Sequence, residues 1–239
     1  MKGRLNFSRP GNPGASVVNE GAITAKQAGL VGLVAPNVAN SGVITAELGH
    51  VQLSSGDTVT VDLYGDKLME VAVSGQVNSQ LVSNSGVISA AGGRIALTAA
   101  AGNDIVNSLI TVRGELKAPA IGRKNGKIFI YAEGANAVRG NVAANKGVKT
   151  GGSTVLVSGR LDVSGRNAGE RGGTIQVLGD NAGLLSGARL DASGQAGGGT
   201  VRVGGDYRGA GKTPPRKTPS CSRILLSTPM PCGAATAGR

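Results

Sequence analysis

Short stretches in which apolar residues alternate with polar or small residues recur along most of this chain. In one recurring stretch, a glycine precedes two aliphatic residues that are separated by a single position. Copies begin at Gly29, Gly49, Gly93, Gly126, Gly152, Gly173 and Gly199, with the pairs Val31/Leu33, Val51/Leu53, Ile95/Leu97, Ile128/Ile130, Val155/Val157, Ile175/Val177 and Val201/Val203. Alternation with period two is typical of a strand with one buried face, so each copy predicts a strand of about five residues.

A second pattern, Asn-x-Gly-x-Ile-x-Ala, precedes several of these strands. Complete copies begin at Asn19, Asn40 and Asn84, which gives spacings of 21 and 44 residues. We interpret these spacings as one and two repeat periods. Looser copies lie at 114–118, 159–163 and 189–192.

Two or three short strands in every repeat of about 21 residues exclude the helix-based repeat architectures. The pattern predicts an all-β fold, a right-handed parallel β-helix with about 20–22 residues per coil, over residues 1–206. Val, Ile, Leu and Ala would stack inward along the rod, and Thr, Ser, Lys and Arg would face water. About nine or ten coils, each ~4.8 Å from the next, would give a rod on the order of 45 Å long.

Glycine and asparagine are expected where each coil turns a corner. Both residues tolerate the left-handed region of backbone conformation. Asn19, Asn40 and Asn84 should occupy equivalent corners, where their side-chain amides can hydrogen-bond along the rod.

Three regions interrupt the repeat. Residues 56–82 contain strand-like runs at 58–63 and 68–73, which we expect to be coils with a small excursion, and residues 131–150 are expected to be a loop or a decorated coil. Residues 207–239 form a Pro-rich, basic tail that holds Cys221 and Cys232, the only two cysteines. Proline at this density cannot continue ladder strands, so we expect a disordered or frameshifted tail.

Composition agrees with a solenoid and excludes several other classes. Aromatic residues make up 2% of the chain and glycine accounts for 41 of 239 residues, so thin aliphatic layers must form the core. The net charge is +11, but basic residues neither cluster with aromatics nor form one stripe, and we expect no specific nucleic-acid partner. Residues 1–8 lack the apolar segment of a signal peptide, so the chain expressed alone would stay in the cytoplasm.

Candidate catalytic chemistry is sparse, and we predict no catalytic, cofactor-binding or metal-binding residue, no cofactor and no enzymatic activity. The single histidine, His50, is expected at a solvent-facing turn, and residues 205–213 imitate a phosphate-binding loop with the wrong spacing. Asp162 and Asp191 occupy equivalent repeat positions, as do Asp180 and Asp206. Such pairs could serve a carbohydrate-active β-helix enzyme, but repeat equivalence favours turn chemistry.

Several segments carry a resemblance to one family. They are residues 3–8, 11–19, 29–42 and 59–66, together with the Gly-x-Ile-x-Ala copies. In combination they resemble filamentous haemagglutinin-type exoproteins of Gram-negative two-partner secretion systems. The family's upstream Asn-Pro-Asn motifs are absent, so we interpret the chain as the end of the secretion domain and the coils that follow it.

The resemblance implies a secreted or cell-surface adhesin whose β-helical shaft presents an adhesive or toxic tip. Its implied partners are an outer-membrane transporter barrel and the host cell surface or matrix. The alternatives are a carbohydrate-active β-helix enzyme and a truncated gene product without function. Because a β-helix fragment exposes ladder edges at both ends, we also expect poor solubility or end-to-end self-association.

Overall fold

The computed structural model describes residues 4–7, 9, 12–56, 58–62, 69–72, 79–99, 107–132, 153–179 and 181–204. These residues form strands joined by turns, and they contain no helix. No segment among them is therefore a helix of the length and apolar character needed to span a membrane.

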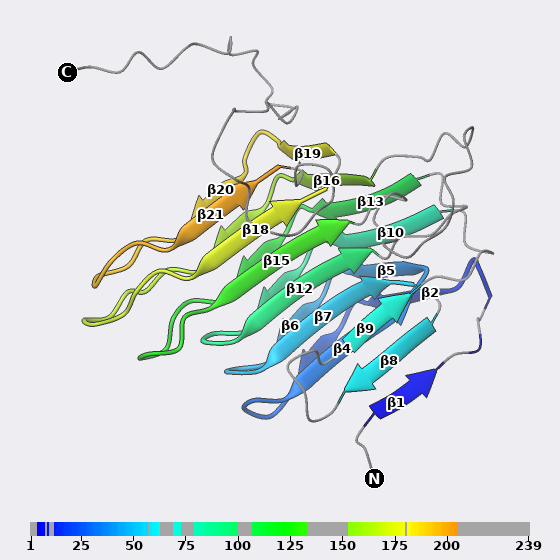
Figure 1. Cartoon of the computed structure of the whole chain (residues 1–239), viewed down its shortest axis with the longest axis horizontal. Coiled ribbons are helices and arrows are strands. Elements are labelled where there is room, and N and C mark those ends of the chain that lie inside the picture. Colours follow the sequence, from blue (N-terminus) through cyan, green and yellow to red (C-terminus); the bar gives the residue numbers. More distant parts are fainter. Residues whose placement is uncertain are drawn as a thin grey trace, which may run out of the picture.

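Three parallel sheets of six strands each make up the body of the molecule (Figure 1). Sheet 1 contains β2 (Ser16–Asn19), β5 (Asn37–Asn40), β10 (Ser79–Asn84), β13 (Asn107–Val112), β16 (Ser153–Val157) and β19 (Asn181–Leu184). Sheet 2 contains β3 (Ala22–Thr24), β6 (Val43–Thr45), β11 (Val87–Ser89), β14 (Glu115–Lys117), β17 (Arg160–Asp162) and β20 (Arg189–Asp191). Sheet 3 contains β4 (Leu30–Ala35), β7 (His50–Ser55), β12 (Arg94–Ala99), β15 (Lys127–Ala132), β18 (Thr174–Leu178) and β21 (Thr200–Val203).

Each coil takes one strand from each sheet in the order 1, 2, 3, so the chain winds as a parallel β-helix. In Figure 1 the strands of sheet 3 run to the right on the near side while later coils lie higher, which is the right-handed sense. The predicted fold class is confirmed, and the three sheets are held in register along their whole length.

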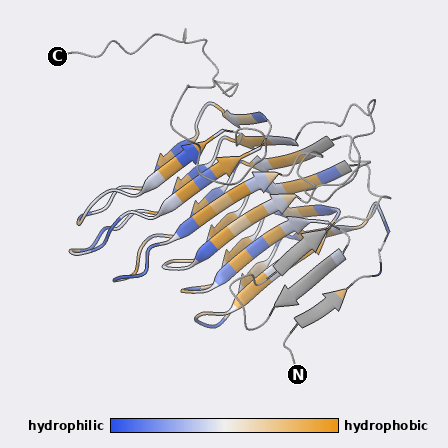
Figure 2. Ribbon diagram, in the orientation of Figure 1, coloured by the Kyte–Doolittle hydropathy of each residue, from blue (hydrophilic) through white to orange (hydrophobic). Residues whose placement is uncertain are grey.

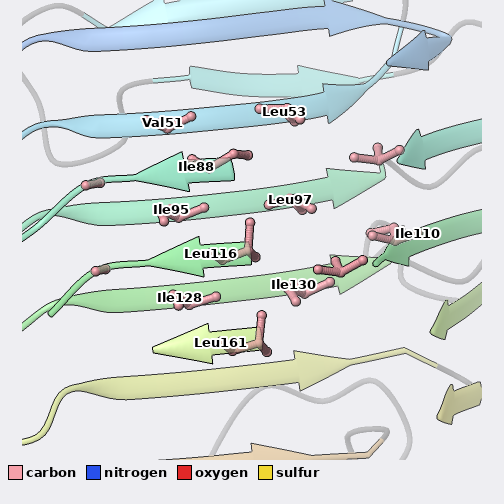
Figure 3. Packing of buried hydrophobic residues seen from close by; sticks show 14 of the residues in the cluster. Val51, Leu53, Ile88, Ile95, Leu97, Ile110, Leu116, Ile128, Ile130 and Leu161 are labelled. Carbon is pink, nitrogen blue, oxygen red and sulfur yellow. The ribbon is translucent and has the colours of Figure 1, made fainter. Parts of the chain in front are cut away.

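Aliphatic columns fill the space between the sheets, as the alternation predicted. Ile44, Ile88, Leu116 and Leu161 stack in consecutive coils of sheet 2, and each is fully buried. Figure 3 shows the last three in one column beside the paired columns of sheet 3. Along the sheet 3 strands, apolar and polar positions alternate in Figure 2, because successive side chains point to opposite faces.

The positions of the asparagine corners and their amide ladder are also confirmed, although none of the three asparagines adopts the left-handed backbone conformation that the prediction invoked. Asn19, Asn40 and Asn84 end β2, β5 and β10 and lie in register. The Asn19 Nδ2 donates to Asn40 Oδ1 at 2.7 Å, and the Asn40 Nδ2 donates to Asn84 Oδ1 at 2.7 Å. In the next coil the position is taken by Val112, so the amide ladder gives way to an aliphatic column.

A glycine follows at the next corner position of each of these coils. A Cβ built on Gly86 would overlap the carbonyl oxygen of Gly42 in the coil below, and Gly42, Gly114 and Gly159 meet the preceding coil in the same way. Gly21, at the same position of the first coil, has no atom within 4 Å of such a Cβ. In the second to fifth coils this corner requires glycine because the neighbouring backbones approach closely. In the last coil Ala188 takes the same register position, after a corner that is two residues longer.

The predicted coil count is wrong: the described residues form six coils, not nine or ten. The spacing of 44 residues between Ile44 and Ile88 is one coil with an insertion, because β6 pairs directly with β11. The insertion contains β8 (Thr58–Asp62) and β9 (Met69–Ala72), which form an antiparallel sheet with β1 (Arg4–Phe7) instead of the expected coils. The periodicity could not separate these cases, because a strand of either direction shows the same alternation.

Later coils also exceed the predicted 20–22 residues, because residues 100–106 and 133–152 separate β12 from β13 and β15 from β16, and because the links between sheets 2 and 3 are longer in the last three coils. These links are 25–29, 46–49 and 90–93 in the first three coils, and 118–126, 163–173 and 192–199 in the last three. The predictions for most of 131–150 and for the tail from 207 lie outside the described residues.

Candidate functional site: a charged hollow on sheet 2

The outer face of sheet 2 changes character halfway along the rod. In the first three coils its two outward columns hold Ala22, Val43 and Val87, and Thr24, Thr45 and Ser89. In the last three coils the same columns hold Glu115, Arg160 and Arg189, and Lys117, Asp162 and Asp191. Charged side chains in these two columns are therefore confined to the last three coils, which also have the longer links between sheets 2 and 3.

A hollow of about 430 Å³ lies where the charged columns meet these links. Its lining residues are Glu115, Lys117, Pro119, Ala120, Arg160, Asp162, Arg166, Asn167 and Glu170. Three carboxylates and three cations thus face one concave surface, and this makes it the candidate functional site.

Asp162 is buried at the end of β17, and both of its oxygens accept hydrogen bonds. Its Oδ1 accepts from the backbone N–H of Ser164 at 2.9 Å and from the Ser164 hydroxyl at 2.6 Å. Its Oδ2 accepts from Arg166 at 2.6 Å and from Arg160 at 3.4 Å. The carboxylate closes the turn that follows β17, so neither oxygen is left without a donor.

Asp191 repeats this turn one coil later. Its Oδ1 accepts from the Ser193 hydroxyl at 2.7 Å and from the Ser193 N–H at 3.0 Å. These two hydrogen bonds, with a smaller contribution from Arg166 and Arg160, lower the pKa of Asp191. Asp162 and Asp191 thus accept the same two hydrogen bonds from the serine two residues later, which is the turn chemistry that their repeat positions predicted.

Glu170 joins two neighbouring links and was not singled out from the sequence. Its Oε1 accepts from the backbone N–H of Gly122 at 2.9 Å and from the Asn167 side-chain amide at 3.0 Å. Its Oε2 accepts from the Asn167 N–H at 3.0 Å. The Asn167 side chain is the main cause of a lowered pKa for Glu170, and the two backbone donors add to it.

The cations of the hollow are more exposed than its carboxylates. Lys117 Nζ lies 2.8 Å from Glu115 Oε2, and Arg160 Nε lies 3.7 Å from Glu115 Oε1. Exposed pairs of this kind contribute about 0–1 kcal/mol each, because water and salt screen them. The charges of the hollow therefore largely satisfy one another.

His50 begins β7, at the strand start where the glycine pattern placed it, but it is partly buried, so the prediction of a solvent-facing histidine was wrong. It is half-buried between Leu30 and Arg94 of the neighbouring strands. Burial, and secondarily the positive charge of Arg94, lowers the pKa of His50 and favours the neutral imidazole. The Arg94 guanidinium in turn lies 4.6 Å from the ring centroid of Phe129, in a cation–π contact.

Across the described ranges, no three His, Cys, Asp or Glu side chains gather in an arrangement that could hold a metal ion. Asp180 and Asp206, the residues that imitate a phosphate-binding loop, and both cysteines lie outside those ranges.

Comparison with known proteins adds no family. No protein-family model matches the chain, and no curated protein matches it. The structure shows an all-β parallel solenoid in which charged side chains occupy the outer face of sheet 2 in the last three coils.

Proposed function

We propose that this chain is a shaft segment of a secreted, filamentous haemagglutinin-like exoprotein, and that it holds a binding or toxic tip away from the cell. In this proposal an outer-membrane transporter exports the chain, and the tip contacts the host surface or matrix. The segments that resemble this family support the family assignment in the proposal. The architecture supports the mechanical role.

The observation that carries the mechanical role is the continuity of the three sheets. Each sheet runs through six coils in register, and the insertion between β7 and β10 leaves the stack without adding a strand to it. Every coil is thus fixed to the next by three short ladders and by aliphatic columns. An element of this kind transmits position and force along its axis, as a shaft requires.

The charged hollow supports a spacer better than a catalyst. Its two buried carboxylates, Asp162 and Glu170, each accept at least three hydrogen bonds from the chain itself. Proton transfer needs a carboxyl group that can reach a substrate atom, and these groups are committed to turns.

Export tests the proposal directly. We would place the chain between a two-partner secretion domain and an epitope tag, in a Gram-negative host with the matching transporter. The epitope should appear outside the cell, and a host without the transporter should retain it. An epitope that stays inside the cell, while the secretion domain alone is exported, would contradict the proposal.

A carbohydrate-active enzyme is the second candidate, and the hollow on the outer face of sheet 2 is the observation in its favour. Incubation with acidic polysaccharides, followed by measurement of reducing ends and unsaturated products, should show no release above background. Release that disappears in Asp162→Asn, but persists in the control Thr45→Ala, would favour the enzyme over the shaft.

A further inference from the structure

The two ends of the solenoid carry unpaired strands. Within the described residues, the strands of the first coil, β2, β3 and β4, each pair on one side only. The same holds for β19, β20 and β21 of the last coil. Each end therefore presents three parallel edges, with backbone N–H and C=O groups directed along the rod axis.

The aliphatic columns reach both ends and become accessible there. Ile88 and Ile175, in the third and fifth coils, are fully buried. At the last coil, Leu190 is only partly buried and Val201 is 44% exposed. At the first coil, Val17 and Ile23 are partly buried members of the same columns.

The two ends are complementary because every coil stacks on the next in one way. Strands of the same sheet pair in parallel and in register at all five contacts between coils. A first coil placed on a last coil in this register would set Ile23 on Leu190 and Val31 on Val201. These pairs closely match Leu161 on Leu190 and Ile175 on Val201 within the chain.

The outward columns raise no repulsion in this arrangement. Arg189 would lie beside Ala22, Asp191 beside Thr24 and Arg202 beside Gly32, so that no like charges meet.

We propose that a second copy of this chain binds by its first coil to the last coil of the first copy, and that repetition of this contact builds head-to-tail filaments. The contact is heterologous and does not close, so its product is a filament instead of a dimer.

Asn19 weakens the proposed contact. Along the amide ladder each Nδ2 points toward the following coil, and the Oδ1 of Asn40 accepts from the preceding one. The Oδ1 of Asn19 has the same orientation, faces the open end, and accepts no hydrogen bond within the described structure. In the filament it would meet Leu184, which has no donor, and an unsatisfied buried acceptor weakens binding by roughly tenfold or more.

The prediction is therefore that removal of this amide strengthens association. We would compare the full wild-type chain with Asn19→Val by sedimentation velocity over a range of concentrations, and would view the particles by electron microscopy. A reductant would keep Cys221 and Cys232 from linking chains. The wild type should form weak, concentration-dependent rods, and Asn19→Val should lower the dissociation constant roughly tenfold or more.

Two variants at the opposite end provide the controls. Leu190→Lys would place a charge in the contact, and Val201→Pro would remove an N–H that the alternation of the ladder directs to the open edge. Each should abolish rods both alone and combined with Asn19→Val. Circular dichroism would show whether each variant folds. If one of them does not fold, the other still tests the contact, because Leu190 lies in sheet 2 and Val201 lies in sheet 3.

A third variant separates the end of the ladder from its interior. Asn40→Val alters the same ladder but leaves the amide of Asn19 at the open end, so it should not strengthen association. Monomers at every concentration for both the wild type and Asn19→Val would overturn the proposal. Rods that persist in Leu190→Lys and Val201→Pro would overturn it as well, because association would then use another surface. The inference concerns this chain as an isolated polypeptide and rests on its fold, not on the exoprotein proposal, so a failed export experiment would leave it standing.

Discussion

At the scale of single residues, the corner between sheets 1 and 2 shows how closely sequence and packing are linked. The glycine after each corner asparagine is required only where another coil lies beneath it. Gly86 has the carbonyl of Gly42 in the place that a Cβ would take, whereas Gly21 has open space there. The same repeat position is therefore constrained in one coil and free in another.

This difference predicts unequal effects from one substitution. Gly86→Ala should lower the free energy of unfolding by about 1–3 kcal/mol, because the added methyl group forces two coils apart. Gly21→Ala is the matched control and should change it by less than about 0.5 kcal/mol. Chemical denaturation of the three proteins at low concentration would check this, and equal losses at both positions would contradict it.

Glu170 predicts a dependence of stability on pH. The pKa of its carboxyl is lowered in the folded chain from the usual value of 4.5, so the ionised form stabilises the fold fully above that pH. The contribution is lost as the pH falls from 4.5 through the folded-state pKa. The difference in unfolding free energy between the wild type and Glu170→Gln should therefore shrink between pH 6 and pH 3.

Asp191 also has a lowered pKa and contributes to acid unfolding, so the difference between two proteins that share it isolates Glu170. Amide exchange at Gly122, whose N–H binds the Glu170 carboxylate, gives an independent readout. A stability difference that stays constant with pH would show that the carboxylate does not hold the two links together.

At the scale of elements, the insertion between β7 and β10 explains the spacing of 44 residues. The chain passes from β4 to β5 through Pro36 alone. Removing residues 57–78 would leave Gly56 alone between β7 and β10, and the distance from Ile44 to Ile88 would fall from 44 to 22 residues. That distance is close to the 21 residues between Ile23 and Ile44.

Deletion of residues 57–78 should therefore leave the solenoid folded, with a far-UV circular dichroism spectrum dominated by strand. Deletion of residues 79–84, which removes the inner strand β10, is the control. It takes a strand and the core residue Val82 out of sheet 1. The control should be unstable or insoluble although it removes fewer residues, and equal behaviour of the two deletions would contradict the arrangement described above.

The sequence predicted most strands of sheets 2 and 3, because their aliphatic alternation and their glycine corners agree. It predicted the amide ladder because Asn19, Asn40 and Asn84 recur at the same position of the repeat. It could not predict that β8 and β9 leave the stack, since strand direction depends on partners that are distant along the chain. It also missed Glu170, whose contact with Gly122 spans 48 residues between two irregular links.

At the scale of the whole molecule, a solenoid has only neighbour-to-neighbour contacts, so its stability varies along its axis. Each inner coil is held on two sides, and each end coil is held on one side. Local opening should therefore begin at the ends.

Hydrogen exchange at a concentration where the chain is monomeric would check this. Amides of β11 and β12 should exchange most slowly, and those of β2–β4 and β19–β21 should exchange fastest. Uniform protection along the rod would mean that the coils unfold as a single cooperative body. Conditions that favour head-to-tail rods should slow exchange at both ends and leave β11 unchanged.

The constrained glycine corner also bears on how such a molecule changes length. Every inner coil contains its own corner glycine and its own aliphatic core residues. A duplicate of such a coil would therefore stack on the original in the same register as any two neighbouring coils. Gene duplication of one whole coil would thus yield a longer protein that needs no compensating mutation, whereas duplication of a partial coil would misalign every face that follows it.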